Sequence, residues 1–130
     1  MSNLPRLLVI DDEPALADFM AAAARMTGFE PTIAADQKGF VRAYEAVTPD
    51  VIALDLGMPN TDGVEFIRFL ADHGFAGPVL IVSGFDRRVL ESAFRLGKEL
   101  GLRMAGPLEK PVRLDELEEL LATLKPGQVR

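Results

Sequence analysis

Three apolar runs constrain the fold of this chain more than any other feature, because their apolar residues are continuous rather than alternating. They are Leu7–Ile10, Val51–Leu54 and Val79–Val82. A strand with one face in water alternates apolar and polar residues, whereas a strand covered on both faces of a parallel sheet is apolar throughout. The three runs therefore predict a parallel sheet with helices packed against both of its faces.

Two weaker strands and five helices complete an alternating order. Further strands are predicted at Pro31–Ala34 and Met104–Leu108. Apolar residues at helical spacing predict the helices Ala15–Met26, Gln37–Val47, Val64–Leu70, Val89–Leu100 and Leu114–Leu124, the second behind an N-cap at Asp36. Five strand-helix units indicate an α/β protein with helices on both sides of one parallel sheet, of Rossmann or flavodoxin-like type. Of these two we predict the flavodoxin-like (βα)5 fold, a three-layer sandwich with strand order 2-1-3-4-5.

Length and composition indicate one domain in the cytoplasm. A chain of 130 residues with 48% hydrophobic content can build one core, which we assign to residues 1–124, with 125–130 as a flexible tail or the start of a linker. No stretch reaches the ~20 apolar residues of a membrane span, and Met1–Arg6 lacks the features of a signal peptide. A net charge of −6 argues against direct binding to nucleic acid.

Carboxylates follow two of the strands at the place where such sheets bind ligands. That place lies beyond the carboxyl ends of the strands, where the strand order reverses, which for the flavodoxin-like order is between the first and third strands. Asp11 and Asp12 follow the first strand and Asp55 follows the third. The chain has no cysteine, and clustered carboxylates without thiolates suit Mg²⁺. Glu13, before Pro14, is better explained as a local acid at a helix start.

The fourth and fifth strands also end in polar residues that suit a phosphoryl group. Ser83 and Gly84 follow the fourth strand, and Lys110 follows the fifth. Taken singly, each is better explained as a turn or surface residue. Taken with Asp55 they suggest aspartyl phosphate chemistry, in which a carboxylate beside Mg²⁺ attacks phosphorus while cations balance the transferring oxygens.

Over nearly its whole length the chain resembles the receiver domains of two-component response regulators. The segments that carry the likeness are Val9–Pro14, Leu54–Pro59, Asp62–Gly63 and Lys110–Pro111. The resemblance implies that a histidine kinase or a histidine phosphotransfer protein phosphorylates the chain, and that phosphorylation switches a surface for a downstream partner or a C-terminal output domain.

The resemblance also assigns roles to single residues. Asp55 would be the phosphoacceptor, Asp12 a direct Mg²⁺ ligand and Asp11 a ligand acting mainly through water. Gly57 would offer its carbonyl to the metal. Ser83, the Gly84 amide and Lys110 would hold the phosphoryl oxygens, and Met58-Pro59 would fix the loop after Asp55.

Two features depart from the usual receiver pattern. Pro107 occupies the position where receivers carry a switching Tyr or Phe, and proline in a strand is tolerated only at an edge. The signal could instead pass through Phe85, which is equally well explained as an apolar cover of the site. Lys110 lies 27 residues after Ser83, a few more than receivers commonly show between these two positions. The sequence of this segment resembles that of receivers attached to cyclic-di-GMP phosphodiesterase (EAL) domains.

Three other functions remain open at this point. A pseudo-receiver would keep the fold and act as an interaction domain without phosphate, and Pro107 is the feature that favours it. A phosphohydrolase with an aspartate nucleophile would need a second acid two residues later, where this chain has Gly57. A nucleotide-binding Rossmann domain would need a glycine-rich loop where this chain has Asp11-Asp12-Glu13-Pro14.

Overall fold

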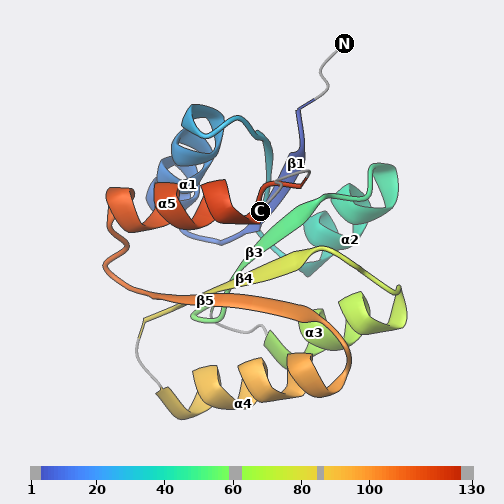
Figure 1. The fold of residues 1–130 in the computed structure, drawn as a ribbon. Helices are drawn as coiled ribbons and strands as arrows, with labels where there is room; N and C mark the ends of the chain where they lie inside the picture. Colours follow the sequence, from blue (N-terminus) through green and yellow to red (C-terminus); the bar gives the residue numbers. More distant parts are fainter. Residues whose placement is uncertain (1–3, 59–62, 85–86, 127–130) are drawn as a thin grey trace.

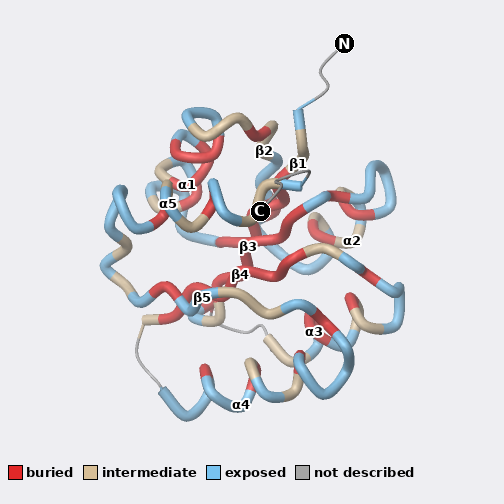
Figure 2. The backbone as a smooth tube through the Cα atoms, in the orientation of Figure 1, coloured by how far each residue is buried: buried red, intermediate tan, exposed pale blue. Residues whose placement is uncertain are grey.

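Five parallel strands form a single sheet in the order β2-β1-β3-β4-β5, as the sequence predicted (Figure 1). The structure is a computed structural model that describes residues 4–58, 63–84 and 87–126. The strands are β1 (Arg6–Ile10), β2 (Glu30–Ala34), β3 (Val51–Asp55), β4 (Pro78–Ser83) and β5 (Arg103–Glu109). All residues of β3 and β4 are buried (Figure 2), which explains why their sequences are apolar without alternation.

Five helices cover the two faces of the sheet. They are α1 (Pro14–Met26), α2 (Gln37–Ala46), α3 (Gly63–Asp72), α4 (Arg87–Glu99) and α5 (Leu114–Leu124). One apolar cluster joins the sheet to α2, α3 and α4, and a second joins it to α1 and α5. The three-layer α/β sandwich is thereby confirmed, and each predicted helix is present with ends within two residues of those expected.

Local sequence signals explain where the helices next to the sheet's ligand-binding edge begin. The Asp36 side chain accepts a hydrogen bond from the Gly39 amide at 2.7 Å, which confirms Asp36 as the N-cap of α2. Glu13 is the N-cap residue of α1, ahead of Pro14 in the first turn, and its exposed side chain makes no capping bond. It therefore remains a local residue of the helix start.

The edge strand β5 contains an irregularity around Gly106 and Pro107. Leu80 pairs with Ala105 and Val82 pairs with Leu108, so β5 has one residue more than β4 between these pairs. Gly106 adopts a φ of +89°, which glycine tolerates best. Because β5 has only one neighbouring strand, the missing amide hydrogen of Pro107 leaves the sheet intact, as expected for an edge strand.

Within the described residues, no helix is both long enough and apolar enough to cross a lipid bilayer. Helix α5 ends at Leu124, where the domain was expected to end. The assignment of 125–130 to a tail or linker stays a prediction, and 127–130 lie outside the described residues.

Candidate acidic site at the carboxyl ends of the strands

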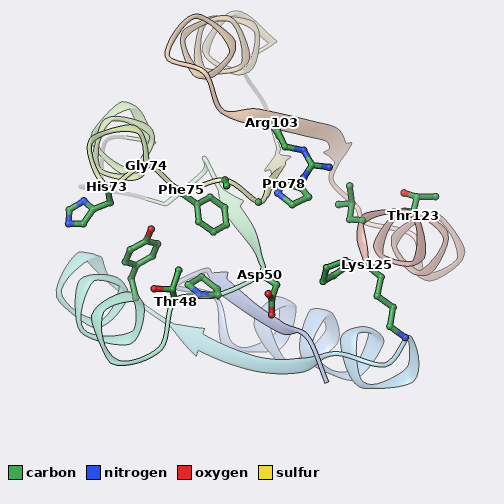
Figure 3. Close-up of a pocket in the computed structure, with 15 residues that line it drawn as sticks. Thr48, Asp50, His73, Gly74, Phe75, Pro78, Arg103, Thr123 and Lys125 are labelled. Atoms are coloured by element: carbon green, nitrogen blue, oxygen red, sulfur yellow. The ribbon is translucent and has the colours of Figure 1, made fainter. Parts of the chain in front are cut away.

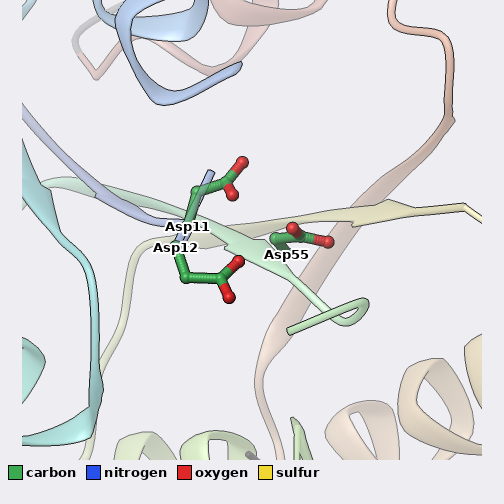
Figure 4. A group of neighbouring side chains, drawn as sticks. All are labelled: Asp11, Asp12 and Asp55. Atoms are coloured by element: carbon green, nitrogen blue, oxygen red, sulfur yellow. The ribbon is translucent and has the colours of Figure 1, made fainter. Parts of the chain in front are cut away.

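The sheet register brings the three predicted acids together. Ile10 pairs with Leu54 across β1 and β3, so Asp11 and Asp55 follow neighbouring positions. The carboxylates of Asp11, Asp12 and Asp55 each offer an oxygen, and these oxygens lie within 4.8 Å of one another (Figure 4). Acids 44 residues apart in the chain thus share one site, because parallel strands end on the same edge of the sheet.

Both oxygens of Asp55 have partners. Its side chain is 2% exposed; Oδ1 accepts the Gly57 amide hydrogen at 2.8 Å, and Oδ2 lies 3.0 Å from the Lys110 ammonium. The Lys110 backbone amide also donates to the Ser83 carbonyl at 2.9 Å. The ends of β3, β4 and β5 are therefore tied together around Asp55.

Asp11 is buried and incompletely partnered. It is 1% exposed, and its Oδ1 accepts the Glu13 amide hydrogen at 2.9 Å. Its Oδ2 is the buried side-chain oxygen that finds no donor among the described residues. Burial raises the pKa of the Asp11 carboxyl to about 6, and the neighbouring charge of Asp55 acts in the same direction. An unsatisfied buried carboxylate oxygen is costly unless a cation meets it.

The acidic cluster has the charge and chemistry that a divalent cation requires. Three carboxylates and the Lys110 ammonium carry a formal charge of −2, which one divalent ion would neutralise. The side-chain ligands are all oxygens, as Mg²⁺ prefers. The unpartnered Oδ2 of Asp11 supplies a free ligand atom. The residues present therefore fit Mg²⁺.

The remaining predicted site residues lie at the same edge. Ser83 is buried and pairs with Glu109 in the sheet register, and a Cβ added to Gly84 would lie 3.4 Å from the Lys110 side chain. A Cβ on Gly57 would lie 3.3 Å from Asp55 Oδ1, so glycine at this position leaves the space beside the Asp55 carboxylate open. The carbonyl role of Gly57 and the phosphoryl-binding roles of Ser83 and Gly84 stay predictions.

The loops after β3 and β4 contain residues that the structure does not describe. Pro59 and Asp62 of the loop after Asp55, and Phe85 with Asp86, lie outside the described residues. The proposed lever at Phe85 therefore stays untested.

Sequence reasoning did not single out Glu109, whose carboxylate lies 3.3 Å from the Arg87 guanidinium and joins the end of β5 to the start of α4.

The comparison with known families decides what kind of protein carries this site. The model described as "Response regulator receiver domain" matches residues 7–122. This chain belongs to that family. The receiver is 30% identical over 120 residues to the transcriptional regulatory protein TrcR of Mycobacterium tuberculosis. The matched segment covers 92% of this chain and 44% of TrcR. It is also 35% identical over 98 residues to the regulatory protein VirG of Agrobacterium fabrum, and this match covers 75% of this chain and 38% of VirG.

Solved receiver structures match over nearly their full length. A signal receiver domain from Bermanella marisrubri shares 30% identity at a TM-score of 0.77, covering 92% of this chain and 96% of that one. A response regulator from Colwellia psychrerythraea shares 29% identity at a TM-score of 0.77, covering 97% and 100%. The receiver spans less than half the length of the curated relatives named above. The likeness to receivers attached to EAL domains stays a prediction.

Proposed function

We propose that this receiver accepts a phosphoryl group from a phosphohistidine donor onto Asp55 in an Mg²⁺-dependent reaction. The observation that carries the proposal is the position of Asp55, buried, 3.0 Å from Lys110 and clustered with Asp11 and Asp12. In the transfer, an Asp55 carboxylate oxygen forms a bond to phosphorus while the bond from phosphorus to the donor imidazole nitrogen breaks. That nitrogen then takes up a proton from solvent.

Different residues of the site would hold the metal ion and contact the phosphoryl oxygens. Asp11, Asp12 and Asp55, with the carbonyl of Gly57, would hold Mg²⁺, which when bound neutralises charge on the phosphoryl oxygens. Lys110 already contacts Asp55 and would move its hydrogen bond to a phosphoryl oxygen. Ser83 is the last residue of the neighbouring strand β4 and Gly84 follows it, and the Ser83 hydroxyl and the Gly84 amide would donate to the remaining oxygens.

The acyl phosphate would be lost by in-line attack of water. Water forms a bond to phosphorus, the bond to the Asp55 oxygen breaks, and inorganic phosphate leaves with the carboxylate restored. The receiver would turn over no external substrate. Phosphorylation adds about −1.5 to −2 charges, drawing Ser83 and Lys110 inward and shifting a surface for a downstream protein or output domain. The donor is a histidine kinase or histidine phosphotransfer protein, and we place the reaction in the cytosol.

Intact-mass measurement tests the proposal directly. We expect one added phosphoryl group after incubation with Mg²⁺ and acetyl phosphate, none with a chelator, and none in Asp55→Asn. Asp50→Asn is the matched control, because Asp50 is an exposed acid at the far end of β3 and should leave labelling intact. An unlabelled wild type, or equal labelling of Asp55→Asn, refutes the proposal.

A phosphorylation-independent pseudo-receiver is the second candidate, and Pro107 favours it. Proline provides no aromatic ring to report the state of the site, and Pro107 is exposed on the edge strand β5. If Asp55→Asn binds the downstream partner as the wild type does and leaves cellular output unchanged, this second function replaces the first.

A further inference from the structure

Helix α4 carries a glycine in its last turn, on the side that packs against the edge strand β5. Gly97 is buried, and with Leu90 and Ala93 it forms the buried face of the helix. A Cβ added to Gly97 would lie 2.8 and 2.9 Å from the Met104 Cε and Cγ and closer still to the Met104 sulfur. Glycine is less favourable than alanine inside a helix. The space that it leaves for the Met104 side chain explains its place here.

The turn after α4 brings Met104 back over Gly97. The Leu102 amide donates a hydrogen bond to the Gly97 carbonyl at 2.9 Å, which closes this turn. Arg103, the residue before Met104, pairs with Pro78 at the amino end of the sheet (Figure 3). Met104 is partly buried against the apolar cluster that joins the sheet to α4. Its thioether therefore fills the contact between the last turn of α4 and β5, at the end of the sheet opposite the acidic site.

Met104 differs in its surroundings from the other methionines that the structure describes. Met20 and Met58 are 1% and 5% exposed, so the fold shields their side chains from solvent. Met26 is 69% exposed at the end of α1. Within the described part of the chain, Met104 alone combines partial exposure with packing against a core cluster. A small oxidant would therefore reach its sulfur, and the fold would respond to the change.

Oxidation would convert this apolar contact into a polar one. With hydrogen peroxide, a bond forms between the methionine sulfur and one peroxide oxygen while the oxygen–oxygen bond breaks. The sulfur is oxidised to a sulfoxide and the peroxide is reduced to water. The sulfur lies so close to α4 that Gly97 has no room for a Cβ, and an added oxygen on that side has no room either. Burying the polar sulfoxide against the helix without a donor is unfavourable.

We propose that Met104 is a reversible oxidation site and that its sulfoxide releases the last turn of α4 from β5. The surface formed by α4 and β5 would thereby respond to peroxide, and methionine sulfoxide reductases would restore it. The proposal rests on the packing of Met104 against Gly97 and does not depend on phosphorylation of Asp55.

Peroxide treatment of the folded protein, followed by peptide mass mapping, tests where oxygen is added. We expect sulfoxide at Met26 and Met104, with Met20 and Met58 protected. Met104→Leu keeps an apolar side chain but has no sulfur to oxidise, and Met26→Leu is the matched control. Each variant is compared with itself before and after treatment, so that any effect of the substitution alone cancels.

Amide hydrogen exchange then tests whether the sulfoxide opens the turn. The Leu102 amide reports on the turn after α4 and the Phe29 amide on the equivalent turn after α1, since each donates at 2.9 Å to a carbonyl of the preceding helix. Treatment should accelerate Leu102 exchange by about tenfold or more in the wild type and in Met26→Leu, and leave it unchanged in Met104→Leu. Phe29 exchange should stay unchanged in all three. Methionine sulfoxide reductases with a thiol reductant should reverse the acceleration.

Met104→Gln and Met26→Gln give a second test without any oxidant, because glutamine is polar and similar in length to methionine. Met104→Gln should accelerate Leu102 exchange by about tenfold or more, and Met26→Gln should not. Any of four results overturns the proposal. They are a Met104 left intact while Met26 is fully oxidised, unchanged Leu102 exchange in oxidised protein or in Met104→Gln, equal acceleration in treated Met104→Leu, and equal acceleration of the Phe29 amide.

Discussion

Replacing Asp11 with asparagine should stabilise the metal-free protein at neutral pH. Burial raises the pKa of the Asp11 carboxyl from 3.8 to about 6. Between these two pH values the folded protein holds a proton that the unfolded chain has released. The free energy of unfolding therefore falls as the pH rises from about 4 to 6, and the full penalty of the buried charge is present above pH 6.

The size of the effect follows from the same numbers. A rise in pKa from 3.8 to about 6 corresponds to about 3 kcal/mol. Water reaches the cluster from the side of the exposed Asp12, and screening lowers the expected gain to roughly 1 to 3 kcal/mol. At about 3 °C per kcal/mol for a domain of this size, the melting temperature should rise by roughly 3 to 9 °C. An asparagine oxygen can still accept the Glu13 amide hydrogen.

Thermal melts with and without Mg²⁺ at pH 4 and pH 8 measure this effect. Without metal, the Asp11→Asn variant should be the more stable protein at pH 8 and nearly equal to the wild type at pH 4. Added Mg²⁺ should stabilise the wild type more than the variant, since bound ligand adds RT ln(1 + [L]/Kd). The exposed control Asp12→Asn should shift metal-free stability by less than about 1 kcal/mol. A metal-free Asp11→Asn that melts below the wild type at pH 8 contradicts the reasoning.

Three predictions concern the scaffold, each measured by urea denaturation. Asp36→Ala removes the N-cap of α2 and should lower the free energy of unfolding by about 1 kcal/mol, and an unchanged value contradicts the capping role. A Cβ added in Gly77→Ala would collide with the backbone carbonyl of Asp50, so we expect a loss of about 1 to 3 kcal/mol; a neutral result would mean that this turn gives way. Glu109→Gln breaks an exposed pair with Arg87 and should cost less than about 1 kcal/mol.

Much of the fold and the membership of the site could be predicted from residues close together in the chain. Continuous apolar runs identified β3 and β4, because a strand covered on both faces has no polar side. Helical spacing and the Asp36 cap located α2. The rule that parallel strands present their carboxyl ends on one edge predicted that Asp11 and Asp55 lie close together, as they do.

Other features depended on distances that no local pattern contains. The contact of Lys110 with Asp55 joins residues 55 apart, and the unpartnered oxygen of Asp11 reflects how its neighbours pack. The extra residue in β5 near Gly106 appears only when β5 is paired with β4. The pairing of Glu109 with Arg87 likewise depends on where α4 begins relative to the edge strand.

Periodicity, caps and strand-end residues determined by themselves the layered sandwich and the edge of the sheet that carries the acids, because those signals are set by near neighbours and by general rules of chain topology. Only the tertiary structure decided which carboxylate oxygen lacks a hydrogen-bond partner and which cation contacts Asp55. The reason is physical: burial and hydrogen bonding of a side chain depend on atoms brought close by register and packing, which are properties of the whole fold.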